Sequence, residues 1–156
     1  MVYDSVARYV WARKGSKPCI LSTGVHKATC LFGVLSLDGR QLFRQYDWVN
    51  GDNFLLFMKE AKRKFGKFLI FLDKSNPHRK NKKVVEWLKT NKNCIKVVWF
   101  PTARPELNPV EECWRQTKDA KVACRIYPSF GEMKGEIAGY VRTRRFRLDI
   151  VKYLCR

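Results

Sequence analysis

The chain has 156 residues, which suits one domain with its own core and leaves too little for two. Hydrophobic residues make up 46% and aromatic residues 13%, so the composition favours a folded protein over a disordered one. With 32 Lys and Arg against 14 Asp and Glu, the net charge is +18, and self-repulsion of that size calls for an anionic partner. Nucleic acid is the partner this charge favours, and an anionic membrane or another acidic partner is the alternative.

Short apolar runs and the cysteine pattern exclude several classes of protein. The longest runs, 68–72 and 95–100, are too short to span a bilayer, and the N-terminus lacks the apolar core of a signal peptide. We therefore expect a cytoplasmic, nucleoid-associated protein without a membrane partner. None of the six cysteines forms a C-x-x-C pair, which argues against zinc, and we expect reduced thiols.

The first half of the chain has the pattern of β-strands. Strands are predicted at 9–11, 20–22, 28–37 and 41–46. The first two flank the turn at 13–18 and form a hairpin arm, and the last two are joined by Asp38-Gly39, a strong turn dipeptide. The N-terminal half is thus expected to begin with a β-meander.

Helices alternate with strands in the remainder of the chain. Helices are predicted from an N-cap at Asn53 to about 65, at 80–90, from Pro109 to about 123 and from 130 to about 142. The apolar runs 68–72 and 95–100 indicate strands buried on both faces, and three prolines make 101–109 irregular. This order predicts an α/β mixed sheet flanked by helices, similar to the ribonuclease H-like fold. Trp48, Trp99 and Trp114 are assigned to its core, Trp114 in preference to a stacking platform.

Two acids are candidates for chemistry. Asp73 ends the most apolar strand, at the edge where open α/β sheets bind ligands, although a turn aspartate is also common there. Glu111 lies in the first turn of a predicted helix, beside its apolar face. A first-turn acid that interacts with the helix dipole is the alternative for Glu111.

The strings around these acids, FLDKSNPH and PTARPELNPVEECWRQTK, resemble two signature blocks of mariner-type DDE transposases, in particular the prokaryotic insertion-sequence branch. The resemblance places Asp73 as the second acid and Glu111 as the third. The 37 residues between them are close to the number that separates the second and third acids in the family. The hairpin YVWARKGSKP, the strand CLFGVLSLDGRQLF and the helix beginning NGDNFLLFMKEA also fit, so the likeness covers about 9–123 of one domain, 1–156, with a basic helical segment at about 124–156.

The family resemblance implies divalent-metal-dependent cleavage and transfer of DNA strands, with Asp73 and Glu111 as catalytic metal ligands. Two Mg²⁺ or Mn²⁺ ions would activate the nucleophile and stabilise the leaving oxygen. Transposon-end and target DNA are the expected partners, bound by a homodimer. DNA-binding residues are expected to include His78, Arg79, Lys80, Arg104 and Asn108. For His78 a helix-capping role, and for the lysines a solvated face, are the alternatives.

Several features depart from the family pattern. The first acid lies more than ten residues before the hairpin tryptophan in the family, but here Trp11 has only ten residues before it and Asp4 is too close. Lys74 replaces the usual Asn after the second acid. We therefore expect an N-terminally truncated copy with an incomplete first strand, impaired catalysis and poor solubility at low salt. Asp4, or an acid from another chain, is the alternative source of the missing ligand.

Three functions compete on this basis. The first is a metal-dependent transposase domain, and the second is a non-catalytic, basic DNA-binding remnant of one. The third, an RNA-directed ribonuclease of the same fold, is disfavoured by the LNPVE block. A cluster at Arg142, Arg144, Arg145 and Arg147 suits either phosphate binding or solubility.

Overall fold

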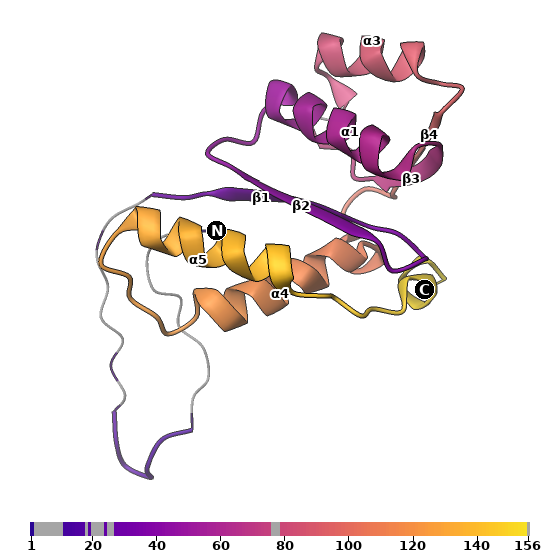
Figure 1. Cartoon of the computed structure of the whole chain (residues 1–156). Helices are drawn as coiled ribbons and strands as arrows, with labels where there is room; N and C mark the ends of the chain where they lie inside the picture. Colours follow the sequence, from indigo (N-terminus) through magenta and orange to yellow (C-terminus); the bar gives the residue numbers. More distant parts are fainter. Residues whose placement is uncertain (2–10, 18, 20–23, 25–26, 76–78, 156) are drawn as a thin grey trace.

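The computed structural model describes residues 1, 11–17, 19, 24, 27–75 and 79–155. Its elements in chain order are β1 (Cys30–Leu35), β2 (Gln41–Tyr46), α1 (Gly51–Phe65), β3 (Phe68–Leu72), α3 (Lys82–Thr90), β4 (Ile95–Trp99), the 3-10 helix η1 (Pro105–Leu107), α4 (Pro109–Lys121), α5 (Phe130–Thr143) and α6 (Ile150–Leu154). The β1–β2 ribbon lies between α1 on one side and α4 and α5 on the other (Figure 1).

The β1–β2 hairpin is antiparallel, with Cys30 opposite Tyr46 and Leu35 opposite Gln41, and its strand pairing matches the prediction. Gly39 closes the turn with a φ of 81°, a left-handed conformation that glycine adopts without strain. Alternate residues face opposite layers, as the two-residue period of a strand requires. One face packs into the α1 core and the other against α4 and α5.

Helix α1 begins three residues earlier than the predicted cap would place it. Asn50, in an extended conformation, caps the helix by accepting from the Asn53 backbone N–H at 2.8 Å. Asn53 lies in the first turn, where its side chain donates to the Trp48 carbonyl at 2.8 Å. The prediction of Asn53 as N-cap was therefore wrong, because two asparagines stand three residues apart and both suit helix starts.

Strands β3 and β4 are parallel, with Phe68 opposite Ile95 and Leu72 opposite Trp99. Helices α1 and α3 cover one face of this pair, which buries Ile70, Leu72 and Ile95. On the other face Leu69 is 52%, Phe71 39% and Val98 38% exposed. The expectation of strands buried on both faces was wrong here, because an apolar run does not show whether a second layer covers it.

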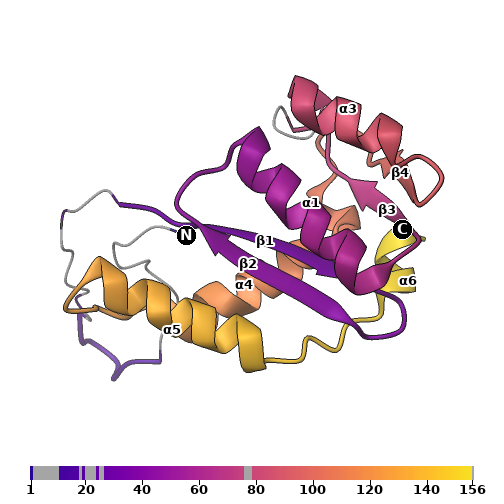
Figure 2. The same ribbon diagram turned by 45° about the horizontal axis from the view of Figure 1, so that its top comes forward.

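The described strands form two separate pairs, and an apolar cavity of about 420 Å³ lies between the facing edges of β1 and β3. Its walls include every residue of 32–37 and of 68–73. Successive side chains point to opposite faces of a strand, so a hollow lined by consecutive residues runs along the strand's edge. We call this cavity the strand slot. The mixed α/β class is confirmed, and the view in Figure 2 shows the two strand pairs side by side with α1 packed across them.

The N-terminal arm, Trp48 and the C-terminal helix differ from the sequence-based expectations to different degrees. The turn at 13–16 is present, with the Ser16 N–H donating to the Arg13 carbonyl at 2.9 Å, but most of the arm's predicted strands fall outside the described residues. Trp48 was wrongly assigned to the core, because it lies in the loop after β2 and is 74% exposed. Helix α6 was not predicted. Among the described helices, none has the length and apolarity needed to cross a bilayer.

Candidate active site

Asp73 directly follows β3, so the strand fixes its backbone while its side chain reaches solvent. The Ser75 backbone N–H donates to Asp73 Oδ1 at 3.2 Å, which turns the chain away from the strand. The side chain lies at the end of the strand slot. Asp73 is thus a carboxylate held at the carboxyl end of a strand, as the sequence predicts.

Glu111 is positioned by the start of α4. The Asn108 side chain accepts from the Val110 N–H at 3.1 Å, and Pro109 occupies the first turn, so the helix start is fixed. Val110 is buried against β1. Gly33 allows this approach, since a Cβ there would lie 2.4 Å from the Phe43 ring and 3.0 Å from the Val110 side chain.

The two acids affect each other electrostatically. The pKa of Glu111 is raised above its ordinary value, first by desolvation, although the side chain is exposed, and also by the negative charge of Asp73. Lys118 lies about two turns further along α4, and its positive charge lowers the pKa of Glu111. The fold therefore brings Asp73 and Glu111 to one edge, from a strand and from a helix.

The carboxylate of the neighbouring acid, Glu112, accepts hydrogen bonds from two residues further along α4. Its carboxylate accepts from Arg115 at 2.6 and 2.7 Å and from Gln116 at 2.9 Å, and these bonds lower its pKa. Because Glu112 faces along α4 toward these partners, Glu111 is the acid directed to the site.

Comparisons with known proteins identify the family. Residues 3–134 match the family described as DDE superfamily endonuclease. The chain belongs to this family. The DDE resemblance drawn from the two acid-bearing blocks is thereby confirmed.

The fold of this DDE domain is similar to that of a chain in the crystal structure of the Mos1 strand transfer complex, with a TM-score of 0.63 at 15% identity. The likeness covers 99% of this chain and 47% of the Mos1 chain, so the domain spans about half the length of that protein. It accords with the ribonuclease H-like fold expected from the sequence. No curated protein matches the domain significantly.

The residues predicted to bind DNA have different environments. Arg79 and Lys80 are exposed just before α3, and Arg104 is exposed and pairs with Glu106 at 3.1 Å. Asn108 is half-buried, and its oxygen caps α4, so its visible role is to fix the helix that carries Glu111. His78 and Asp4 lie outside the described residues.

Carboxylate oxygens are the ligands that Mg²⁺ prefers, and this ion often binds through one or two carboxylates with water and substrate phosphate completing its shell. Asp73 and Glu111 fit that requirement, and the pKa of Glu111 is raised first by desolvation and then by the charge of Asp73, both of which a bound cation would offset. Within the described ranges, no three His, Cys, Asp or Glu side chains are grouped to hold a metal. The described part of the domain therefore offers two carboxylates, Asp73 and Glu111, as candidate ligands.

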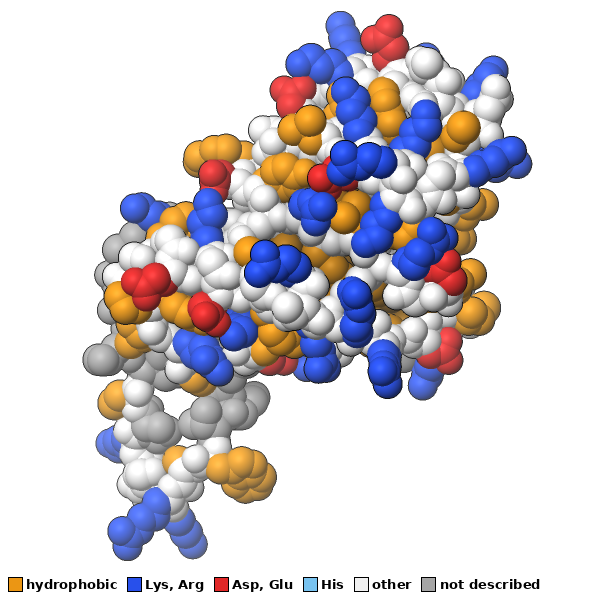
Figure 3. All heavy atoms as spheres, in the orientation of Figure 1, with side chains coloured by type: hydrophobic (Ala, Val, Ile, Leu, Met, Phe, Trp, Pro, Cys, Tyr) orange, Lys and Arg blue, Asp and Glu red, His pale blue; other side chains and the backbone are white. Residues whose placement is uncertain are grey.

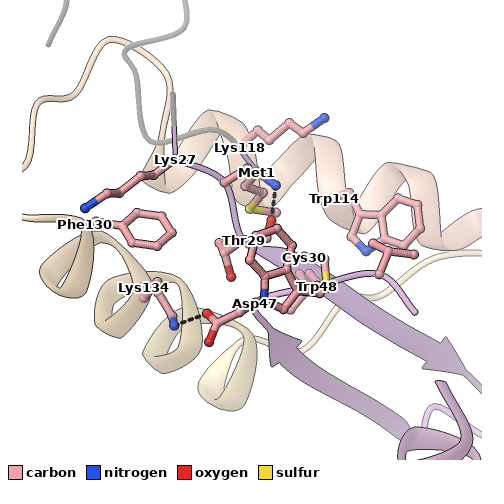
Figure 4. Close-up of a pocket in the computed structure, with 13 residues that line it drawn as sticks. Met1, Lys27, Thr29, Cys30, Asp47, Trp48, Trp114, Lys118, Phe130 and Lys134 are labelled. Atoms are coloured by element: carbon pink, nitrogen blue, oxygen red, sulfur yellow. Dashed lines mark hydrogen bonds and ion pairs between the residues drawn. The ribbon is translucent and has the colours of Figure 1, made fainter. Parts of the chain in front are cut away.

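A second hollow lies beside this site, and we call it the aromatic pocket. It has a volume of about 970 Å³ and is lined by Met1, residues 27–31, residues 47–49, Trp114, Lys118, Phe130 and Lys134 (Figure 4). Trp114, half-buried, lines both this pocket and the strand slot. Sequence reasoning missed the pocket because its aromatic residues come from three elements that are distant in the chain.

A third hollow, the basic groove, lies along β2 between α1 and α5 and has a volume of about 710 Å³. Its cations are Arg44, Arg63, Lys64, Arg142 and Arg145. Its one acid, Glu60, pairs with Arg44 at 2.6 Å and Arg63 at 3.7 Å. Lys and Arg side chains spread over the face that contains α1 and α5 (Figure 3). The structure thus joins part of the C-terminal arginine cluster to cations from β2 and α1.

Proposed function

We propose that this DDE domain acts in DNA transposition, as the domain in which Asp73 and Glu111 bind divalent cations for cleavage and transfer of DNA strands. The observation that carries the proposal is the convergence of these two acids at the carboxyl end of β3. The family match supports phosphodiester chemistry, and the acids supply the oxygen donors that Mg²⁺ or Mn²⁺ prefers. Metal ions bound here would neutralise charge that develops on the phosphate.

The protein's own part in this reaction is to position DNA and cation. The end of β3 and the capped start of α4 position the two carboxylates. Exposed Arg79, Lys80 and Arg104 lie on segments that flank the acids and are suited to phosphate contacts, which fix the register of DNA without reading sequence. The nucleophile would be water in strand cleavage and a DNA 3′-hydroxyl in strand transfer.

We infer that the chain, as it stands, binds DNA strongly and cleaves it weakly. Two acids in the described residues leave the ion with fewer protein ligands than a three-acid site provides, and exposed Lys74 adds positive charge next to Asp73. A non-catalytic DNA-binding role is the second candidate. The net charge of +18 and the five cations of the basic groove favour it.

Plasmid nicking separates these functions. The chain is incubated with supercoiled plasmid and Mn²⁺ or Mg²⁺, beside Asp73→Asn, Glu111→Gln and the matched control Glu112→Gln. We expect tight, salt-dependent binding and little nicking, with any nicking lost in the first two variants and kept in the control. Strong nicking that depends on Asp73 would refute impaired catalysis. Nicking that persists in both site variants would refute the assignment of the acids.

A further inference from the structure

The aromatic pocket opens next to the two acids along the same helix. Glu111, Trp114 and Lys118 are spaced by three and four residues on α4, so they share one face of it. Glu111 and Lys118 are seven positions apart on the helix, which corresponds to a rise of about 10 Å. The electrostatic effect of Lys118 on Glu111 agrees with this proximity. A DNA strand with a phosphate at the acids would therefore carry its neighbouring nucleotide to the pocket.

Three aromatic side chains from separate elements line the pocket. Trp48 comes from the loop after β2, Trp114 from α4 and Phe130 from the start of α5 (Figure 4). Trp48 is 74% exposed, which is unusual for an indole with no other role in the described core. Such rings offer flat apolar faces of the kind on which nucleobases stack.

A buried donor in the pocket has no partner. The Trp114 indole N–H is shielded from solvent and makes no hydrogen bond among the described residues. A buried donor of this kind is costly unless something accepts from it. Because this nitrogen has almost no accessible surface, the Trp114 side chain would have to shift before a bound nucleotide could accept from it.

The charge of the pocket suits an anion. Met1 contributes its amino group, which donates to the Thr29 carbonyl, and Lys27 and Lys118 are exposed on the lining. Burial lowers the pKa of the Met1 amine and the positive charge of Lys118 lowers it further, so the amine loses its charge more readily than an ordinary N-terminus, and the cations offered to a ligand are Lys27 and Lys118. Among the described residues of the lining, the one acid is Asp47, which is paired with Lys134 (Figure 4). An excess of positive charge therefore remains for a phosphate.

We propose that the aromatic pocket binds one unpaired nucleotide of a DNA strand, with its base against Trp48 and its phosphate near Lys118. The proposal rests on the proposed function, because it takes DNA as the substrate of the adjacent acids. An unpaired nucleotide fits better than a duplex, since bases in a duplex expose edges to the protein and keep their faces stacked on each other. The pocket would then hold the strand next to the phosphate that the acids contact.

Binding of a short single strand containing 2-aminopurine tests this, without metal and without cleavage. The base's fluorescence is quenched when it stacks on an indole. We expect Trp48→Ala to weaken binding of the single strand about tenfold and to relieve the quenching, because one base–aromatic stack is lost. Leu56→Ala, which removes an exposed large apolar side chain from α1, is the matched control and should change neither.

Two further measurements sharpen the result. Lys118→Ala should lower the salt slope for the single strand by about 0.7, the change expected for one lost phosphate contact, whereas exposed Lys59→Ala on α1 should leave it unchanged. Trp48→Ala should leave affinity for a blunt duplex of the same sequence unaltered. Equal single-strand affinity and equal emission for Trp48→Ala and Leu56→Ala would overturn the proposal.

The result of the single-strand binding test does not depend on whether the chain cleaves DNA. The binding assay contains no metal and no cleavage step, so its readout does not require the acids to hold a cation. If nicking proves independent of Asp73 and Glu111 while Trp48 still governs single-strand binding, the proposed function fails and the pocket stands. If nicking follows the acids while Trp48 has no effect on the strand, the pocket fails alone.

Discussion

Asp73, at the end of β3, lies close enough to Glu111, in the first turn of α4, for its negative charge to add to the desolvation that raises the pKa of Glu111. The two residues are far apart in sequence and come from different layers of the fold. Two carboxylates placed within each other's field disfavour ionisation, and a bound cation reverses that preference. The pair is therefore a point where stability, pH and metal binding are coupled.

Glu111→Gln should stabilise the folded chain at neutral pH. The folded pKa of Glu111 is raised, so the folded state holds this proton more tightly than the unfolded state, and stability falls as pH rises through that pKa. Glutamine removes the destabilising charge. The gain should be below about 1 kcal/mol because the side chain is exposed. It should vanish below pH 4.5, as measured by thermal unfolding.

The control variant, Glu112→Gln, should change the stability of the fold in the opposite direction. Bonds from Arg115 and Gln116 lower the pKa of Glu112, so its ionised form stabilises the fold and this contribution is lost as pH falls through the lowered pKa. Glu112→Gln should therefore lower the unfolding temperature at neutral pH. Equal responses of the two glutamine variants would contradict the electrostatic account of Glu111.

Mn²⁺ or Mg²⁺ should raise the unfolding temperature of the unmodified chain. Binding to the folded state alone stabilises it by about 2.7 kcal/mol at a ligand concentration one hundred times the dissociation constant. Asp73→Asn should remove most of this effect, and Glu112→Gln should keep it. A metal response unchanged by Asp73→Asn would place the binding ion elsewhere.

Charge reversal in the basic groove should weaken binding to duplex DNA and reduce its dependence on salt. The double variant Arg63→Glu, Arg145→Glu removes two cations from the groove, and the salt slope should fall in magnitude by about 2 if both contact phosphate. Lys89→Glu with Lys92→Glu, two exposed lysines at the end of α3, makes the same change in net charge. Identical slopes for the two double variants would show that net charge alone drives binding.

Gly33→Ala should destabilise the fold and disturb the acid pair. The added Cβ would lie 2.4 Å from the ring of buried Phe43, and overpacking of this kind costs about 1–3 kcal/mol. The Val110 side chain, one residue before Glu111, would also have to move. Denaturant unfolding measures the cost, and Gly135→Ala, with nothing near its added Cβ, should be neutral or stabilising.

Local sequence signals located most of the elements. The Asp38-Gly39 dipeptide, the alternating strand at 41–46 and the start of α4 at Pro109 depend on neighbouring residues, and their positions agree with the structure. The two acids were predicted from motif and strand-end reasoning; in the structure Asp73 lies near enough to affect the pKa of Glu111, while their role stays a prediction. Local chemistry was sufficient for these features because turns, caps and strand ends are determined within a few residues.

Features that depend on tertiary layers were not predicted. The exposed face of Leu69 and Phe71 and the exposure of Trp48 depend on what packs against them, which composition does not specify. The aromatic pocket and the basic groove likewise join residues from three elements each. Arg63 and Arg145, 82 positions apart, carry no pattern that links them before the chain folds.

The strand slot divides the described chain into two units that share α1. No described strand bonds across it, so backbone amides on the facing edges of β1 and β3 are expected to exchange hydrogen with solvent sooner than amides between β1 and β2. The β3–β4–α3 unit can then open along this seam while the β1–β2 hairpin stays packed on α4 and α5. In denaturant, unfolding would begin with separation of these two units at the strand slot, so the transition would have two steps.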